Sequence, residues 1–169
     1  TAANSPAPYR DDLFGEQSAR HLFISAPAYN VVRRELLQPS GVSFTSSRPE
    51  GADGPEFLAS RDAWFRPITL RTGPDGALWI ADFYRLVLEH PQWIPNDVEQ
   101  RIDLRSGSDR GRIYRVYRDG SNPRPIPNLA GKTTAQLVAA LDSPGGWARD
   151  TTQQLLLHRS DPKAAQPLA

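Results

Sequence analysis

The sequence contains no cysteine and no methionine. Without cysteine, the chain itself cannot form disulfides, zinc–thiolate sites or a cysteine nucleophile. No apolar run approaches the roughly 20 residues that a membrane-spanning helix needs, and no signal-peptide pattern is present. The formal net charge is only +1, and the basic residues are interspersed with acidic ones rather than with aromatic ones on a single face. This composition argues against a nucleic-acid partner.

What the chain does contain is β-strand patterning between residues 64 and 118. Residues 73–76 (Gly-Pro-Asp-Gly) suit a type I turn, because proline fits its second position and glycine its fourth. The turn makes a hairpin of the first two of four expected strands, which are Ile68–Thr72, Ala77–Asp82, Leu86–Glu89 and Gly111–Tyr117. Four such strands are the unit from which β-propellers are built. The sequence therefore predicts one complete propeller blade.

An internal repeat supports this interpretation. Residues 22–32 align with residues 77–87, each with an apolar strand, a tight corner that carries tyrosine and a second apolar strand. The repeat predicts an earlier blade with strands Leu22–Ala26, Val31–Leu37 and Val42–Ser46, and a first strand within Pro8–Phe14. The competing interpretation is two unrelated hairpins that share a tyrosine by chance.

Two blades cannot close a ring, and ring closure is what removes exposed sheet edges in a propeller. The chain also lacks an initiating methionine and opens on the loop-like residues 1–8. We therefore expect residues 1–118 to be part of a larger propeller.

The character of the sequence changes after Arg118. Residues 119–131 are rich in proline and turn formers, which predicts a linker between domains and the first site of proteolysis, between Gly120 and Gly131. Helical signals follow in residues 132–169. Thr133 and Gln136 form a capping box, and Asp161-Pro162 begins a third helix after two short ones. These helices suggest the start of a HEAT-type repeat array, and a small helical cap on the propeller is the alternative.

Several motifs in this order resemble a known family. They are Glu56–Ser60 with Trp64–Pro67, Gly73–Arg85, Glu89–Pro95, Asp109–Val116 and Trp147–Asp150. Together, over about residues 20 to 160, they resemble the last propeller blades and first HEAT repeat of the bacterial membrane-bound dehydrogenase-like proteins, also called PVC-type haem-binding CxxCH proteins.

The resemblance implies a large secreted or periplasmic parent protein. Its propeller is similar to glucose/sorbosone dehydrogenases, which use pyrroloquinoline quinone, and a c-type haem module follows the HEAT repeats. The cofactors expected of the full-length protein are therefore c-type haem and pyrroloquinoline quinone or calcium. The parent is then expected to oxidise a sugar or alcohol and to pass electrons to that haem. No Cys-x-x-Cys-His motif occurs in this chain, so the haem belongs to another module. No motif supplies a catalytic histidine either, and we expect this segment alone to be inactive and to hold no cofactor. The alternative is a non-catalytic scaffold of propeller and HEAT repeats that binds a glycan or a protein.

The candidate site residues lie at the strand corners. In a four-stranded blade, the connection into the first strand and the corner between the second and third emerge at the same end, where propeller pockets open. This reasoning predicts a pocket rim made of Arg66, Asp82, Tyr84 and Arg85, with Tyr29 and Asn30 at the equivalent corner of the earlier blade. The competing interpretation is an Arg66–Asp82 salt bridge that only braces the blade.

Other candidates have weaker signals. His90 precedes a proline at the start of a long insertion and is a further rim candidate, although a hydrogen-bonding role at the end of a strand is more common. The acidic loop residues Glu50, Asp53, Glu56 and Asp62 lack the regular spacing of a calcium loop, so we assign no metal site. Tryptophans 64, 79 and 93 suit stacking on a sugar, but Trp79 fits a core position better.

Overall fold

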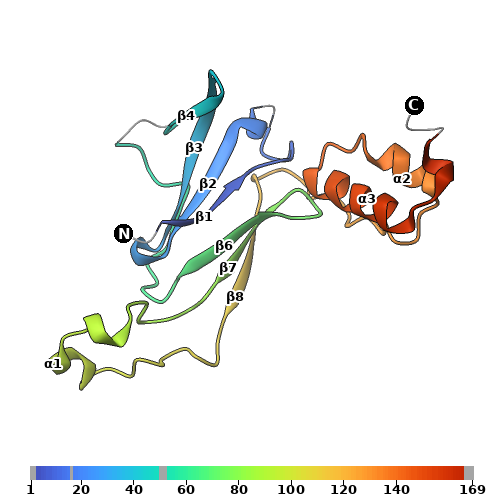
Figure 1. The fold of residues 1–169 in the computed structure, drawn as a ribbon. Helices are drawn as coiled ribbons and strands as arrows, with labels where there is room; N and C mark the ends of the chain where they lie inside the picture. Colours follow the sequence, from blue (N-terminus) through green and yellow to red (C-terminus); the bar gives the residue numbers. More distant parts are fainter. Residues whose placement is uncertain (1–2, 16, 50–52, 166–169) are drawn as a thin grey trace. The chain divides into compact units, whose positions relative to one another are not determined.

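The computed structural model describes residues 3–15, 17–49 and 53–165 and is mainly β, with two antiparallel sheets and a few helices (Figure 1). The chain divides into two compact units, each assembled from segments that are far apart in the sequence. The first unit comprises residues 1–8, 20–71 and 79–115, and the second comprises residues 9–19, 72–78 and 116–169. This division differs from the boundaries predicted at residues 118 and 131, because residues 9–19 and the turn at 72–78 group with the C-terminal part.

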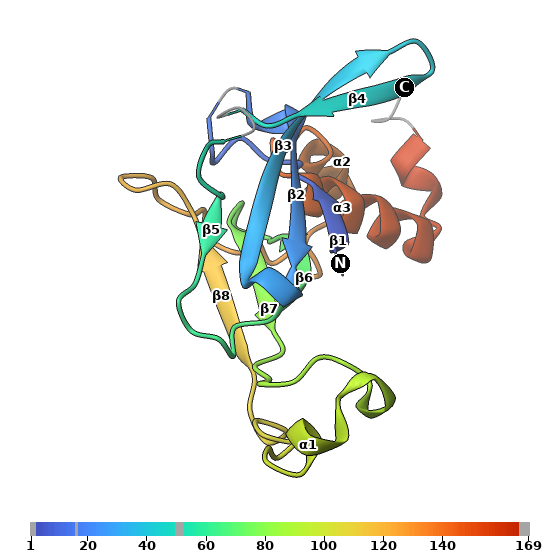
Figure 2. The ribbon, with the colours of Figure 1, turned by 90° about the vertical axis from the view of Figure 1, so that its left-hand side faces the viewer.

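The first sheet is an antiparallel meander of β1 (Asn4–Pro8), β2 (His21–Ala26), β3 (Val31–Ser40) and β4 (Ser43–Ser47). The short β5 (Leu58–Ala59) pairs with the beginning of β3 (Figure 2). The last three strands of the meander confirm the prediction within a few residues. The first strand was predicted within Pro8–Phe14, and that placement is wrong. The strand lies at the edge of the sheet, where its prolines are tolerated but obscure the strand pattern.

The second sheet has three strands in the order β6 (Pro67–Thr72), β7 (Leu78–Asp82) and β8 (Arg112–Val116). The predicted turn joins β6 to β7: the Gly76 amide donates to the Gly73 carbonyl over 3.1 Å, and Gly76 has the positive φ of 86° that favours glycine. The prediction of a strand at Leu86–Glu89 is wrong. Residues 83–111 instead form a long insertion with a 3₁₀ turn, η3 (Pro91–Trp93), and one short helix, α1 (Asn96–Glu99).

The helical part begins at the predicted capping box. Gln136 N donates to Thr133 Oγ1 over 3.3 Å, and Thr133 N donates to Gln136 Oε1 over 3.0 Å. Helix α2 (Thr134–Ala140) and helix α3 (Gly146–Arg159) follow, and then the 3₁₀ turn η4 (Pro162–Ala164), which Asp161 caps. Two further 3₁₀ turns, η1 (Ser18–Arg20) and η2 (Pro27–Tyr29), flank β2.

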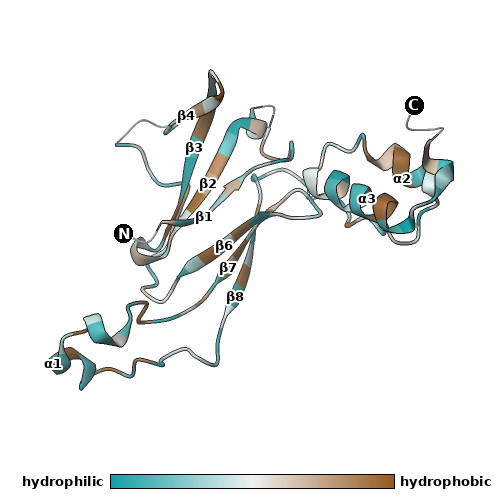
Figure 3. Ribbon diagram, in the orientation of Figure 1, coloured by the Kyte–Doolittle hydropathy of each residue, from teal (hydrophilic) through white to brown (hydrophobic). Residues whose placement is uncertain are grey.

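Burial follows the alternation of the strands. The hydropathy colouring in Figure 3 shows apolar residues along β2, β6 and β7 and on the two helices. The fully buried side chains of the first unit include Phe23, Val32, Leu70 and Ile80. In the second unit, Leu137 of α2 is fully buried, and Thr152 is buried on α3. None of the helices in the described residues is long and apolar enough to cross a membrane.

Candidate functional site

Both predicted corners of the first unit contain a residue with left-handed backbone geometry that is not glycine. Asn30 has a φ of 57° and Tyr84 a φ of 52°. Such conformations are uncommon outside glycine and persist only where the surroundings hold them. The Asn30 side-chain amide donates to the carbonyl of Phe65, which ties the β2–β3 corner to the segment that enters β6. Tyr29, beside it, is exposed.

Arg66 is held entirely by main-chain carbonyl groups. Its Nε donates to the carbonyl of Arg85 over 2.9 Å, its Nη1 to that of Pro27 over 3.0 Å and its Nη2 to that of Leu86 over 2.8 Å. The alternative of an Arg66–Asp82 salt bridge is therefore wrong. Asp82 contacts the main chain of Arg66 instead: its Oδ1 accepts from Arg66 N over 2.7 Å and from Tyr84 N over 2.9 Å.

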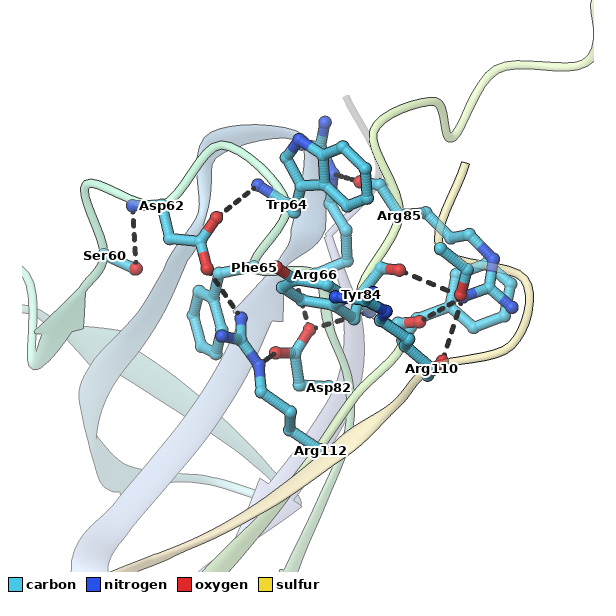
Figure 4. A network of polar contacts seen from close by, with 12 residues as sticks. Ser60, Asp62, Trp64, Phe65, Arg66, Asp82, Tyr84, Arg85, Arg110 and Arg112 are labelled. Carbon is cyan, nitrogen blue, oxygen red and sulfur yellow. Dashed lines mark hydrogen bonds and ion pairs between the residues drawn. The ribbon is translucent and has the colours of Figure 1, made fainter. Parts of the chain in front are cut away.

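The ion-pair partner of Asp82 is Arg112, at the beginning of β8. Arg112 Nε lies 2.7 Å from Asp82 Oδ2, and its Nη2 lies 3.0 Å from Asp62 Oδ2 (Figure 4). The Asp82 side chain is 0% exposed, whereas that of Arg112 is 35% exposed. The carboxylate is thus buried with its charge compensated, as buried charges require.

The pKa values of Asp62 and Arg112 are both shifted in the direction that favours the charged form. The hydrogen bond from the Trp64 amide, together with the Arg112 guanidinium, lowers the pKa of Asp62. Burial alone would lower the pKa of Arg112, but its hydrogen bonds to Asp82 and Asp62 outweigh this effect and raise it. The Arg112–Asp62 ion pair therefore holds across the neutral range.

Aromatic rings enclose the Arg112 guanidinium. Its central carbon lies 4.0 Å from the ring centroid of Tyr84 and 5.4 Å from that of Tyr114. The Tyr84 ring also packs on Trp64, with 5.3 Å between ring centroids. A guanidinium over aromatic faces gains cation–π attraction.

Arg85 closes the neck of the long insertion. Its Nη1 donates to the carbonyls of Tyr84 (2.9 Å), Arg110 (3.0 Å) and Gly107. Gly107 has a φ of 87°, and a Cβ there would lie 2.4 Å from the carbonyl oxygen of Tyr84. Only glycine fits this approach.

The contacts of the Arg66 side chain explain why no strand forms at Leu86–Glu89. The carbonyls of Arg85 and Leu86 accept from the Arg66 side chain. In a regular strand, these carbonyls would alternate between neighbouring strands. Here they converge on one guanidinium, so residues 86–89 do not form a ladder.

The structure brings together most, but not all, of the predicted rim residues. Arg66, Asp82, Tyr84 and Arg85 meet, and Asn30 joins them through Phe65. His90 is exposed in the insertion, where its Nδ1 accepts from the amide of Gln92 over 3.3 Å. It takes no part in the cluster.

The sequence analysis missed three members of the cluster, namely Asp62, Trp64 and Arg112. No local signal marked Arg112: a buried aspartate needs a cationic partner, but the sequence does not show which arginine supplies it. Trp64 was considered only for stacking on a sugar and Asp62 only as part of the acidic loop.

The remaining candidates are separate from the cluster. In the acidic loop, Glu56 pairs with Arg33 over 3.5 Å and with Arg48 over 3.2 Å, and Glu50 lies outside the described residues. No group of three or more acidic or histidine side chains suited to a metal occurs among the described residues. Trp79 on β7 is only partly buried, between the fully buried Leu78 and Ile80, so it does not occupy the core position expected of it. Trp93 is largely exposed on the insertion.

Chemically, this arrangement is a brace. The guanidinium groups of Arg66 and Arg85 are directed at carbonyls, and Asp82 is fully enclosed. A catalytic base or nucleophile needs an atom that can reach a substrate, and these groups are engaged within the protein. The Tyr84 side chain is partly exposed.

Comparison with known proteins identifies the family. No significant match was found among curated proteins or among solved structures. One family model, described as "Domain of unknown function (DUF7133)", matches residues 1–120. This match covers both sheets and the corner cluster of Asp62, Arg66, Asp82, Arg85 and Arg112. The chain therefore belongs to the DUF7133 family of domains.

Proposed function

We propose that this chain is part of the β-propeller of a secreted or periplasmic dehydrogenase-like protein whose catalytic groups and c-type haem lie outside the segment. Support comes from the sequence motifs that resemble that family and from the meander of the first sheet, which has the strand order of a blade. The helices after residue 132 would then begin a HEAT-type array. In this proposal the parent oxidises a sugar or alcohol and transfers the electrons to haem.

The part played by this segment is architectural. The observation that carries this assignment is the engagement of Arg66, Arg85 and Asp82 by main-chain groups and by Arg112. Such a cluster fixes two strand corners rigidly, and a rigid corner is what positions rim residues toward a pocket. Tyr84 is the residue we assign to the rim itself.

The test uses the full-length parent protein and the absorbance of its haem. Addition of members of a broad sugar and alcohol panel is expected to reduce the haem, with an artificial electron acceptor as the reporter of turnover. Haem that stays oxidised with every substrate would overturn the oxidoreductase proposal. That result would favour the alternative, a scaffold that binds a glycan or a protein, for which the exposed Trp93 is a suitable stacking surface.

Two variants distinguish a residue that acts at the pocket rim from one that only stabilises the strand corners. Tyr84→Phe keeps the ring that packs on Trp64 and Arg112 and removes only the hydroxyl. We expect it to lower substrate-dependent haem reduction while leaving the melting temperature unchanged. Arg85→Ala removes the contacts at the neck of the insertion, so it should lower stability and activity together. Unchanged turnover in Tyr84→Phe would remove Tyr84 from the rim and leave the cluster as a brace alone.

A further inference from the structure

The proline-rich segment 119–131 is packed within the second unit, although its sequence is that of an open linker. It contains no helix or strand, yet Leu129 is only 4% exposed. The Arg124 amide donates to the carbonyl of Asp75 over 3.0 Å. The segment is therefore anchored on the Gly73–Gly76 turn of the same unit.

The side chain of Arg124 makes a second anchor. Its Nη1 lies 2.7 Å from Asp12 Oδ1, and its Nη2 pairs with Asp11 Oδ2. The Asp11 side chain is only 1% exposed, and its Oδ1 also accepts from the amides of Asp12 and Leu13 over 2.8 and 3.2 Å. A buried carboxylate that loses its cation destabilises the folded state strongly. Asp11 therefore depends on Arg124.

Two glycines leave the space for this ion pair. A Cβ at Gly76 would lie 2.7 Å from Asp11 Oδ1 and 2.9 Å from Arg124 Nη2. A Cβ at Gly145, just before α3, would lie 3.0 Å from Asp11 Oδ2. The carboxylate thus sits between the turn of the hairpin and the beginning of a helix.

The neighbours of Asp11 in the sequence tie the same elements together. Tyr9 donates its hydroxyl to the carbonyl of Gly76 over 2.5 Å, and burial raises the pKa of this hydroxyl, so it remains a donor. The Arg10 carbonyl accepts from the amide of Gly146 over 2.6 Å, and the Arg10 guanidinium forms an ion pair with Asp150 of α3. Residues 9–12 therefore contact both the turn and the helix.

We propose that residues 119–131 form a strap, with Arg124 as the latch that closes it over Asp11 and Asp12. The strap joins the Gly73–Gly76 turn to α3: the Arg124 amide bonds to the turn, and Arg159 of α3 donates to the carbonyl of Ala130 over 2.8 Å. The helix and this turn then behave as one body within the second unit. On this proposal, residues 119–131 are held against the second unit instead of being the linker that proteases cut first, as the sequence predicts. This inference does not depend on the redox proposal.

Hydrogen–deuterium exchange of the full chain, followed by mass spectrometry, tests the strap. In the wild-type protein, we expect peptides from residues 119–131 to exchange at least tenfold more slowly than unstructured peptide. Arg124→Gln and, independently, Asp11→Asn should remove most of that protection while α2, α3 and the β2–β3 pair stay protected. Arg118→Gln, an exposed arginine at the entrance of the segment, is the matched control and should exchange like the wild type.

The outcomes are distinct. Selective loss of protection in the strap in both variants, with the control unchanged, supports the latch. Rapid exchange of residues 119–131 in the wild type would overturn it, as would wild-type exchange in Arg124→Gln and Asp11→Asn. Loss of protection throughout the chain, including β2–β3, would also overturn it, because the ion pair would then support the whole fold rather than the strap.

Discussion

The two sheets have similar sequences up to the corner that follows their second predicted strand, but the residues after that corner adopt different structures. In the first sheet, the strand after the corner, β3, extends for ten residues and pairs with β2, β4 and β5. In the second sheet, the residues after the corner leave the sheet, and β8 takes the position beside β7. The corners themselves are alike, each with a tyrosine and a residue of positive φ. The difference arises immediately after them.

At the first corner, the residue after the tyrosine is Asn30, whose short amide bonds to Phe65 O and leaves the next residues free to pair. At the second corner, it is Arg85, whose long side chain reaches across to Gly107 and Arg110. Arg66 meanwhile draws in the carbonyls of residues 85 and 86. Two arginines thus replace a strand ladder with a side-chain network.

The largest expected effect concerns the regular sheet. Phe23 on β2 is fully buried and packs on Phe57, with 4.6 Å between ring centroids. Phe23→Ala should lower the free energy of unfolding by about 3–5 kcal/mol, the usual cost of deleting a buried aromatic side chain. Urea denaturation measures this loss. The matched change in the same sheet is Phe44→Ala on β4, where the ring is 64% exposed, and it should cost less than about 0.5 kcal/mol. Equal losses would show that the buried side of this sheet is not its core.

The second prediction concerns the network that replaces the ladder. Arg112→Gln leaves the buried Asp82 without its cation. Loss of one partner of a buried pair costs about 3–5 kcal/mol, and the partial exposure of Arg112 reduces this to about 2–3 kcal/mol. Arg110→Gln is the control, because it keeps the main-chain contacts of Arg110 and removes a guanidinium that lies 3.9 Å from the exposed Asp109. If Arg112→Gln lowers the free energy of unfolding by less than about 1 kcal/mol, the Arg112 ion pairs do not stabilise the second sheet.

Much of the fold was predictable because its signals are local. The Gly73–Gly76 turn, the capping box at Thr133 and the strands around the first corner each follow from neighbouring residues. Patterns of period two and of turn-forming residues carry this information directly.

The parts that were not predicted depend on distant residues. The strand expected at Leu86–Glu89 is lost to Arg66, about twenty positions away, and the partner of Asp82 lies thirty positions away. The strap depends on contacts between Asp11 and Arg124 across more than a hundred residues. Local sequence carries no signal for such pairings, since any of eighteen arginines could serve an aspartate.

The third prediction concerns the close approach of Gly107 to Tyr84 at the neck of the insertion. Gly107→Ala introduces a Cβ 2.4 Å from the Tyr84 carbonyl oxygen, in addition to the strain of a positive φ. Gly41→Ala, in the β3–β4 turn, introduces the same kind of strain, with a φ of 59°, but its Cβ meets nothing within 4 Å. Both changes should destabilise by about 1 kcal/mol through backbone strain, and Gly107→Ala by about 1 kcal/mol more through the clash. Thermal denaturation compares the two variants. Equal losses would show that the neck has room to relax.

The smallest expected effect is a pH dependence in the first sheet. His21 on β2 is only 9% exposed, and burial, with a further contribution from the positive charge of Arg34, lowers its pKa below the ordinary 6.5. Between pH 6.5 and that lowered pKa, the unfolded chain binds a proton that the folded chain does not. The free energy of unfolding is therefore greatest above pH 6.5 and falls as the pH decreases, with a slope of at most about 1.4 kcal/mol per pH unit, the limit for one proton. The carboxylates of Asp12, Asp62 and Asp161 have lowered pKa values and titrate below this range.

Urea denaturation at a series of pH values should show the slope in the wild type and in His158→Gln, a control at an exposed position of α3, and a flatter profile in His21→Gln. The same slope in His21→Gln, or stability that rises as the pH falls through 6.5, would contradict the assignment, because neutral burial of His21 can only favour the folded state at the higher pH.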